Sequence, residues 1–215
     1  MRFSDPSQRR DSYHHGHLRE ALMEAAVRLI AERGPAGFTF AEAARAAGVS
    51  AAAPYRHFRD RNALIAEIAR LGFERFTAEL ETAWADGRPD PLTAMENCGM
   101  AYLRFARREP AAYAAMFGTG LPLDEDPDLR RAGERAFGVL RRASEAVCAV
   151  VPADRRPPAL MVALHIWAMS HGIASLFVGQ SEAGRRKLPM SPEDLLEAGV
   201  LIYLQSLGLA AGRAS

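Results

Sequence analysis

Residues 39–58 read Thr-Phe-Ala-Glu-Ala-Ala-Arg-Ala-Ala-Gly-Val-Ser-Ala-Ala-Ala-Pro-Tyr-Arg-His-Phe, and the prediction of the fold depends on this stretch. Thr39 is expected to cap a short helix that runs from about residue 40 to residue 47. Glu42, three residues later, would complete a capping box, in which the two side chains satisfy each other's free backbone N–H groups. The stretch therefore begins with a strong helix-start signal.

The end of this helix and the start of a second one follow at once. Gly48 can adopt the positive φ that ends a helix in a tight turn. Ser50 is expected to cap a second short helix over residues 51–58. The small side chains of Ala43 and Ala44 would allow the two helices to approach closely. This arrangement predicts a helix-turn-helix, whose second helix reads the DNA major groove.

Polar side chains lie on and just beyond the expected second helix. Tyr55 and His57 can each donate a hydrogen bond to a phosphate oxygen, and Arg61 adds a positive charge at the start of the next helix. Such contacts hold a protein on DNA without reading its sequence.

The first turn of the same helix carries no hydrogen-bonding side chain. Ala51, Ala52 and Ala53 can contact a thymine methyl group but cannot bond a base edge, so specificity must depend on other residues or on DNA shape. Pro54 deletes the first donor within the helix, at a position where proline costs less than in a helix interior.

These residues resemble the TetR family of bacterial regulators over about residues 13–76. The resemblance implies that Thr39, Tyr55 and His57 contact phosphates, and Arg61 stands where the family usually has a phosphate-binding lysine. The run Ala51–Pro54 departs from the polar residues that relatives often place there. The expected partner is a double-stranded DNA operator. The candidate DNA-contacting residues are Thr39, Phe40, Ser50, Ala51, Ala52, Ala53, Tyr55, Arg56, His57 and Arg61.

The rest of the chain has helical periodicity without sustained alternation, which predicts an all-α fold. Further helices are expected at about 16–33, 61–84, 92–108, 110–118, 127–150, 157–180 and 192–207. With the resemblance, this predicts a three-helix DNA-binding domain at residues 16–62, joined by the long helix 61–84 to a helical-bundle domain at residues 63–215 that binds a ligand and dimerises. Residues 1–15 would form a polar arm, either facing phosphates or simply solvated.

The C-terminal half resembles the TetR subgroup named for its Trp-His-Gly motif. The resemblance rests on residues 105–117 and on Trp167-Ala-Met-Ser-His-Gly172, and it implies a small apolar or amphipathic effector. Soft and aromatic side chains can line an adaptable pocket, although each could also belong to an ordinary core. The candidate pocket residues are Met95, Tyr102, Phe105, Tyr113, Met116, Phe117, Met161, His165, Trp167, Met169 and His171; Met100 has the same character.

A homodimer is expected to form through the last two helices, at about 157–180 and 192–207. One stripe of the final helix is apolar or small and includes Leu196, Gly199 and Val200. A symmetric dimer would present two reading helices about 34–36 Å apart, which is one turn of DNA.

Composition excludes several other classes of protein. Residues 1–70 hold 11 Arg, no Lys and 8 acidic residues, which gives the N-terminal third of the chain a net positive charge. Cys98 and Cys148 stand alone, which argues against a disulfide scaffold or zinc ribbon, and the histidines at 14, 15 and 17 lack partners at metal-binding spacing. No metal or cofactor is expected.

Two other functions have less support in the sequence. An enzyme is disfavoured because no catalytic triad, paired carboxylates or P-loop is present. Residues 159–178 carry no formal charge over a membrane-spanning length, but a buried or interface helix explains them equally well. The N-terminus has no apolar signal-peptide region. The expectation is a cytoplasmic regulator outside the membrane.

Overall fold

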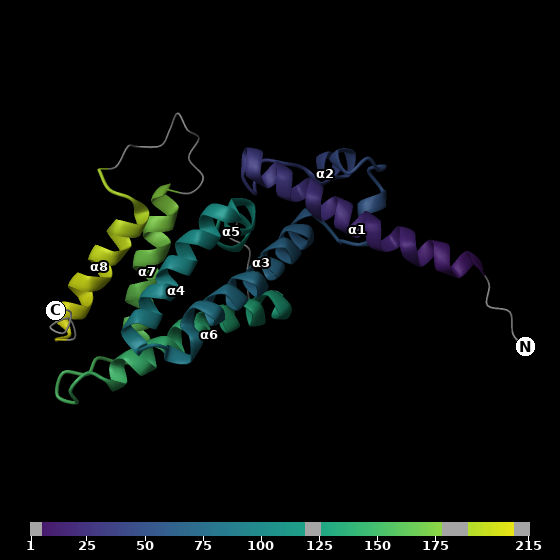
Figure 1. Cartoon of the computed structure of the whole chain (residues 1–215). Helices are drawn as coiled ribbons and strands as arrows, with labels where there is room; N and C mark the ends of the chain where they lie inside the picture. The colour runs from purple at the N-terminus through teal and green to yellow at the C-terminus, as the bar shows by residue number, and fades with distance from the viewer. Residues whose placement is uncertain (1–5, 119–125, 178–188, 209–215) are drawn as a thin grey trace, which may run out of the picture. The chain divides into compact units, whose positions relative to one another are not determined.

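In the computed structural model, which describes residues 6–118, 126–177 and 189–208, all regular elements of the described residues are helices, which confirms the predicted all-α fold (Figure 1). Side chains are described from residue 18 onward. The α-helices are α1 (Pro6–Arg33), α2 (Phe40–Ala46), α3 (Arg61–Trp84), α4 (Pro91–Arg108), α5 (Pro110–Phe117), α6 (Pro127–Ala149), α7 (Ala159–Phe177) and α8 (Pro192–Ser206), and two short 3-10 helices are η1 (Ala53–Arg56) and η2 (Ala85–Gly87).

The chain divides into two compact units. The first comprises Met1–Gly72 and Ala111–Leu129, and the second comprises Phe73–Pro110 and Arg130–Ser215. Helix α3 passes without interruption from one unit to the other after Gly72, and α5 belongs to the first unit. The domain boundaries expected at residues 15, 62 and 63 stay predictions.

Helix α1 begins ten residues before the expected start near residue 16. Pro6 occupies its first position, where a missing N–H costs nothing because that group has no partner inside the helix. Gly16 lies inside the helix, since a single glycine costs only about 1 kcal/mol there. The expected end at Arg33 is confirmed, and Gly34 follows with φ of +75°. The histidines at 14, 15 and 17 precede the first described side chain.

The core of the first unit joins α1, α2 and the first half of α3. Leu22, Ala25 and Ala26 of α1 are fully buried, as are Ala43 and Ala44 of α2 and Leu64 of α3. Their small or branched side chains match the close spacing that the sequence predicted for α2.

Helices α4, α7 and α8 pack together in the second unit (Figure 1). Asp90 caps α4 by accepting bonds of 3.0 Å from the backbone N–H groups of Leu92 and Thr93. Ser191 caps α8 and accepts from Asp194 N at 3.0 Å, as predicted. Both helices therefore begin at fixed residues.

Ion pairs connect the second half of α3 with its neighbours in this unit. The pairs are Glu79 with Arg108, Glu81 with Arg142, Arg75 with Glu109 at 2.7 Å, and Glu74 with Arg135 at 3.6 Å. Phe76 lies between Tyr102 and Phe105, with ring centroids 5.0 and 4.9 Å away. Aromatic packing and paired charges thus fix this half of α3 within the second unit.

Candidate nucleic-acid interface

The capping box at the start of α2 is present as predicted. Thr39 Oγ1 accepts from Glu42 N at 3.2 Å, and Thr39 N donates to Glu42 Oε2 at 2.7 Å. The bond from Thr39 N, together with one from Thr39 Oγ1 to Glu42 Oε2 at 2.9 Å, holds the pKa of the Glu42 carboxyl below its ordinary value, because both donate to the ionised form. Arg33 Nη1 lies 3.1 Å from Glu42 Oε1 and links the end of α1 to the same site.

The turn after α2 also has the predicted geometry. Gly48 has a φ of +74°, a value that favours glycine. Val49 N donates to Ala44 O at 3.0 Å and folds the chain back over the end of α2. The first helix and the turn of the helix-turn-helix are therefore confirmed.

The expected second α-helix over residues 51–58 is wrong. The structure has a turn at 51–52 and then only the 3-10 helix η1, whose N-cap is Ala52 without a side-chain bond, so Ser50 is not the cap. Pro54 has no N–H to donate to Ser50 O, and that carbonyl instead accepts from Ala53 N at 3.0 Å. Pro54 is the sequence signal for this shorter helix, because its missing N–H removes the first α-helical hydrogen bond of the expected element.

The side chain of Tyr55 is 64% exposed, and its ring packs edge-on against Phe40 with centroids 5.1 Å apart. This contact joins the first residue of α2 to the exposed phenol. The other candidate residues in this region are exposed at Thr39, Ser50, Ala51, Ala52 and Arg56, and half-buried at Phe40, Ala53 and His57. The structure thus gathers several expected DNA-contacting residues on η1 and the start of α2.

Arg61 has a role that sequence reasoning missed. Its guanidinium lies over the Phe38 ring, 5.0 Å from the centroid, and donates a hydrogen bond to Pro35 O. Its phosphate contact stays a prediction, and DNA would have to compete with these partners. No local signal marks this contact, because Phe38 and Pro35 lie 23 and 26 residues away along the chain.

The carboxylates of Asp60 and Glu67 fix the first half of α3 within the first unit. Asp60 Oδ1 accepts from Ala63 N at 2.8 Å, which keeps the pKa of the Asp60 carboxyl low. Arg19 lies over Phe58 and pairs with Glu67, which also accepts from Arg70 Nε at 2.7 Å. Arg19 of α1 is thereby connected both to Phe58, which follows η1, and to Glu67 of α3.

The candidate pocket residues do not form one group. Tyr102 and Phe105 are buried in the second unit, and Tyr102 Oη lies 3.0 Å from His171 Nδ1. Burial lowers the pKa of His171, which favours its neutral form. Tyr113, Met116 and Phe117 belong to α5 in the first unit, where Met116 packs against Gly72.

Three other candidates, Met161, His165 and Trp167, are exposed on α7. His165 Nδ1 lies 3.1 Å from Tyr203 Oη on α8, and Met169 is half-buried beside Gly199. Helix α7 is long and apolar enough to cross a membrane, but a third (33%) of its most apolar window is buried inside the protein. Met161, His165 and Trp167 therefore do not line an internal pocket within the described part of this chain.

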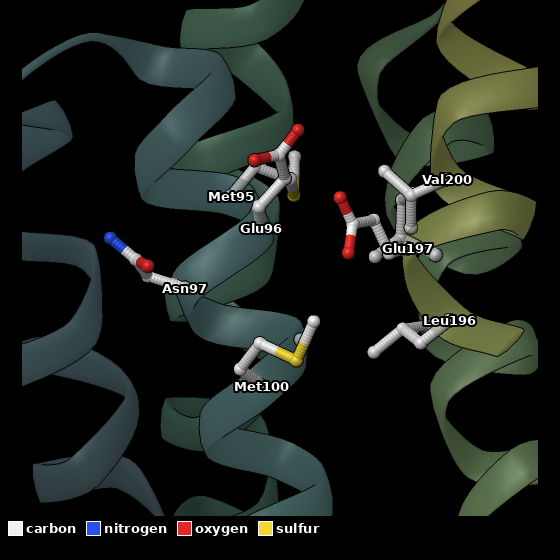
Figure 2. Close-up of a pocket in the computed structure, with 9 residues that line it drawn as sticks. Met95, Glu96, Asn97, Met100, Leu196, Glu197 and Val200 are labelled. Carbon is white, nitrogen blue, oxygen red and sulfur yellow. The ribbon is translucent and has the colours of Figure 1, made fainter. Parts of the chain in front are cut away.

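A cavity of about 170 Å³ lies between α4, α7 and α8 in the second unit. Figure 2 shows the carboxylates of Glu96 and Glu197 directed into the space between α4 and α8, with Met100 and Leu196 below them and Asn97 turned away. Of the eleven candidate pocket residues, Met95 alone lines this cavity. Met100, which is similar in character, lines it too. The full lining is Met95, Glu96, Asn97, Gly99, Met100, Ile166, Leu196, Glu197 and Val200.

Sequence reasoning missed most of this lining because Leu196 and Val200 were read as part of one stripe of a dimerising helix. Both side chains are buried against their own chain. Gly99 allows this approach, since a Cβ there would lie 2.9 Å from Leu196 Cδ2. The periodicity identified a packed face of α8 but not what covers it.

Comparison with known proteins gives consistent matches along the chain. The family described as "Bacterial regulatory proteins, tetR family" matches residues 22–68, and "Tetracyclin repressor-like, C-terminal domain" matches residues 95–202. The "HTH-type transcriptional regulator AcrR" of Shigella flexneri is 36% identical over 78 residues, which is 36% of each chain. The match therefore spans about a third of that curated relative.

Solved structures share the fold over most of their length. A protein of unknown function from Rhodococcus sp. RHA1 has a TM-score of 0.72 and 29% identity, covering 90% of this chain and 97% of its own. The TetR family regulator PfmR from Thermus thermophilus has a TM-score of 0.61 and 23% identity, covering 86% and 97%. The fatty acid degradation regulator FadR from Bacillus halodurans has a TM-score of 0.66 and 13% identity, with full coverage of both chains.

Proposed function

Because this chain belongs to the TetR family of DNA-binding transcriptional regulators, we propose that it is a homodimeric repressor released from its operator by a small apolar or amphipathic effector. The family consists of regulators and not enzymes, so the expectation of a non-enzymatic protein is confirmed. The observation that carries the proposal is the capped turn of the helix-turn-helix, in which the exposed Tyr55 packs against Phe40, the first residue of α2.

DNA is held chiefly through its phosphates. The exposed hydroxyl of Tyr55 and the exposed guanidinium of Arg56 are donors to phosphate oxygens, and half-buried His57 is a further donor. The Thr39 hydroxyl donates to Glu42 Oε2 at 2.9 Å and reaches a phosphate as a donor only if it leaves that carboxylate. Phe40, Ser50 and Ala51–Ala53 approach the DNA as apolar or small contacts. Arg61 reaches a phosphate only if it leaves Pro35 O and the Phe38 ring.

Base reading is weak at η1. The three alanines before Pro54 offer no side-chain donor or acceptor to a base edge, and the donors that η1 does carry, on Tyr55 and Arg56, are assigned to phosphates. Discrimination between operators therefore depends on DNA shape and on the spacing of the two half-sites.

The dimer forms through α7 and α8. Large apolar side chains are exposed on these two helices, and a concentration of exposed apolar side chains supports an interaction site. The residues are Leu160, Met161, Leu164, Trp167, Leu176, Leu201 and Ile202. A twofold interface uses the same face of both copies, which accounts for one apolar patch in each chain.

The effector acts in the second unit, and α3, one continuous helix, transmits its effect to the helix-turn-helix of the first unit. The effector must bind the DNA-incompetent state more tightly, because binding both states equally shifts nothing. The segment Trp167–Gly172, with the Trp167 and His171 rings 6.0 Å apart, supports placement in the Trp-His-Gly subgroup. The partly buried α7 and the DNA partner support a cytoplasmic location.

A mobility-shift titration with the DNA upstream of the chain's own gene tests this function. The wild type should shift the fragment, and Tyr55→Ala and His57→Ala should weaken that shift at equal helix content by circular dichroism. Arg56→Ala should also reduce the slope of log affinity against log salt by about 1. Arg130→Ala, an exposed arginine of α6 in the second unit, is the matched control and should change neither value. Unchanged binding by both Tyr55→Ala and His57→Ala would contradict the assignment of the reading segment.

A further inference from the structure

Arg61, the first residue of α3, is packed against the loop that precedes α2. Its guanidinium lies over the Phe38 ring, 5.0 Å from the centroid, and Nη2 donates to Pro35 O. Arg61 Nε is buried and bonds no other described group, and the Phe38 ring is itself buried. The side chain is therefore enclosed within the first unit and does not extend freely into solvent.

Phe38 stands directly before the residues that begin α2. Thr39 is the N-cap of this helix, and Phe40 is its first residue. The Phe40 ring in turn packs edge-on against the exposed Tyr55, with centroids 5.1 Å apart. A short stretch of chain and two ring contacts thus connect Arg61 of α3 with the phenol that faces DNA in the proposed function.

We infer that Arg61 is a positioning residue for DNA binding. It holds residues 35–38 against the start of α3, and with them Thr39 and Phe40, and it makes no phosphate contact of its own. The inference requires DNA binding, the activity of the chain's family, but it requires neither the proposed dimer nor the proposed effector. The phosphate contact that the family resemblance implies for this position is the alternative that the test excludes.

The positioning role depends on the shape of the guanidinium. A planar guanidinium stacks on an aromatic ring and donates to a carbonyl within its own plane, whereas the ammonium group of lysine is a compact, strongly hydrated point charge. A residue that only neutralises a phosphate needs the charge and not the plane, and lysine serves there as well. Arg61→Lys therefore separates the two roles, because it keeps the charge and loses the stacked geometry.

The present partners of Arg61 oppose a move toward DNA. Reaching a phosphate would break the hydrogen bond to Pro35 O and uncover the buried Phe38 ring. An exposed ion pair gains little in water, so it does not replace a cation–π contact on a buried ring together with a charge-assisted hydrogen bond. The stacked position is thus favoured over a phosphate contact.

The test measures DNA affinity and its salt dependence for the full-length chain by fluorescence anisotropy. One duplex comes from upstream of the chain's own gene, and an unrelated duplex has the same length. Arg61→Lys should weaken binding to both about fivefold, a loss within the range of a cation–π contact. The loss should be equal on the two duplexes, because phosphate contacts carry no sequence information.

The slope of log affinity against log salt distinguishes positioning from phosphate contact. Arg61→Gln removes a charge, yet it should leave this slope unchanged, whereas loss of a phosphate contact would reduce it by about 1. Wild-type affinity in Arg61→Lys, or a slope reduced by about 1 in Arg61→Gln, would overturn the inference. A wild type that binds neither duplex would instead contradict the DNA-binding function.

Stoichiometric titration separates positioning from a merely structural role. A substitution that only unfolds part of the protein lowers the fraction of chains that bind DNA at concentrations far above Kd, and the remaining chains keep their affinity. Arg61→Lys should do the reverse and keep the full binding fraction. Arg59→Lys makes the same change at an exposed side chain paired with Asp60 and should alter neither value. A reduced fraction at unchanged affinity, or an equal loss in Arg59→Lys, would overturn the inference.

A double-mutant cycle tests whether Arg61 acts through Phe38. Phe38→Leu keeps a buried apolar side chain and removes the ring that the guanidinium covers. In this background Arg61→Lys should weaken DNA binding only about twofold or less, because the stacking contact is already absent. An equal loss from Arg61→Lys in the two backgrounds would overturn the inference.

Discussion

The ring of Tyr55 stands edge-on to the ring of Phe40, with centroids 5.1 Å apart and planes at 88°. Phe40 is the first residue of α2, and Tyr55 lies in η1, so this pair joins the two halves of the helix-turn-helix across its turn. The phenol is thereby held at the surface by a contact that does not use its hydroxyl. Removing the hydroxyl and removing the ring are separable experiments.

Tyr55→Phe should weaken operator binding about tenfold while preserving the contact with Phe40. The lost bond is one hydrogen bond to a charged phosphate, which accounts for that magnitude. Because phosphates carry no sequence information, affinity for unrelated DNA should fall by the same factor in fluorescence anisotropy. A loss confined to the operator would mean that Tyr55 reads a base.

Thr39→Ala should lower the free energy of unfolding by about 1 kcal/mol, the usual cost of losing an N-cap side chain. Urea unfolding followed by circular dichroism measures this change. Thr82→Ala is the matched control, because Thr82 bonds Ala78 O inside α3 and caps no helix. Equal effects of the two substitutions would show that the capping box does not stabilise α2.

Gly72 and Met116 form a tight contact within the first unit. A Cβ at residue 72 would lie 2.8 Å from Met116 Sδ, so Gly72→Ala should destabilise the chain by about 1–3 kcal/mol, as overpacking does. In a Met116→Ala background the same substitution should stabilise it by about 1 kcal/mol, the helix propensity difference. Additive effects in this double-mutant cycle would contradict the contact.

The ion pairs of Glu67 should make the free energy of unfolding depend on pH. The hydrogen bond from Arg70, with a further bond from Arg19, lowers the pKa of Glu67 below its ordinary value of 4.5. A carboxyl whose pKa is lower in the folded state stabilises the protein above its unfolded pKa, and this stability disappears as pH falls through the folded pKa. Glu67→Gln should therefore be less stable than wild type at pH 7, and the difference should shrink as the pH falls below about 4.5 and through the folded pKa. A difference independent of pH would show that the ion pairs contribute nothing.

Ile202→Asp should convert the dimer to monomer and weaken operator binding. Ile202 is 67% exposed on α8, and a charge there would be buried without a partner in the interface. Sedimentation velocity gives the mass. Val150→Asp changes an exposed valine beyond the end of α6 and should leave the dimer intact. A dimeric Ile202→Asp protein would place the interface elsewhere.

Features set by neighbours in the sequence were predicted well. The capping box of Thr39 and Glu42, the positive φ of Gly48 and the bounds of α3 depend on residues a few positions apart. The second reading helix was predicted too long because one missing donor at Pro54 outweighed the helical pattern around it. Local pattern thus identified the unit but not the length of its second half.

Features set by distant residues were not predicted. The contacts of the Arg61 guanidinium with Phe38 and Pro35 of an earlier loop were not predicted, while its expected phosphate contact stays a prediction. On α8, periodicity alone cannot say whether a face is covered by its own chain or by a partner. Leu196 and Val200 are buried within the chain, whereas Leu201 and Ile202 on the neighbouring face are exposed.

Hydroxyl-radical footprinting of the full-length chain on the DNA upstream of its own gene tests the central claim most directly. The account predicts two protected segments on one face of the DNA, with centres about one helical turn apart, because each protomer places one reading segment in the major groove. Tyr55→Ala should abolish both segments together. Absence of protection, a single protected segment, or a footprint that Tyr55→Ala leaves unchanged would contradict the claim.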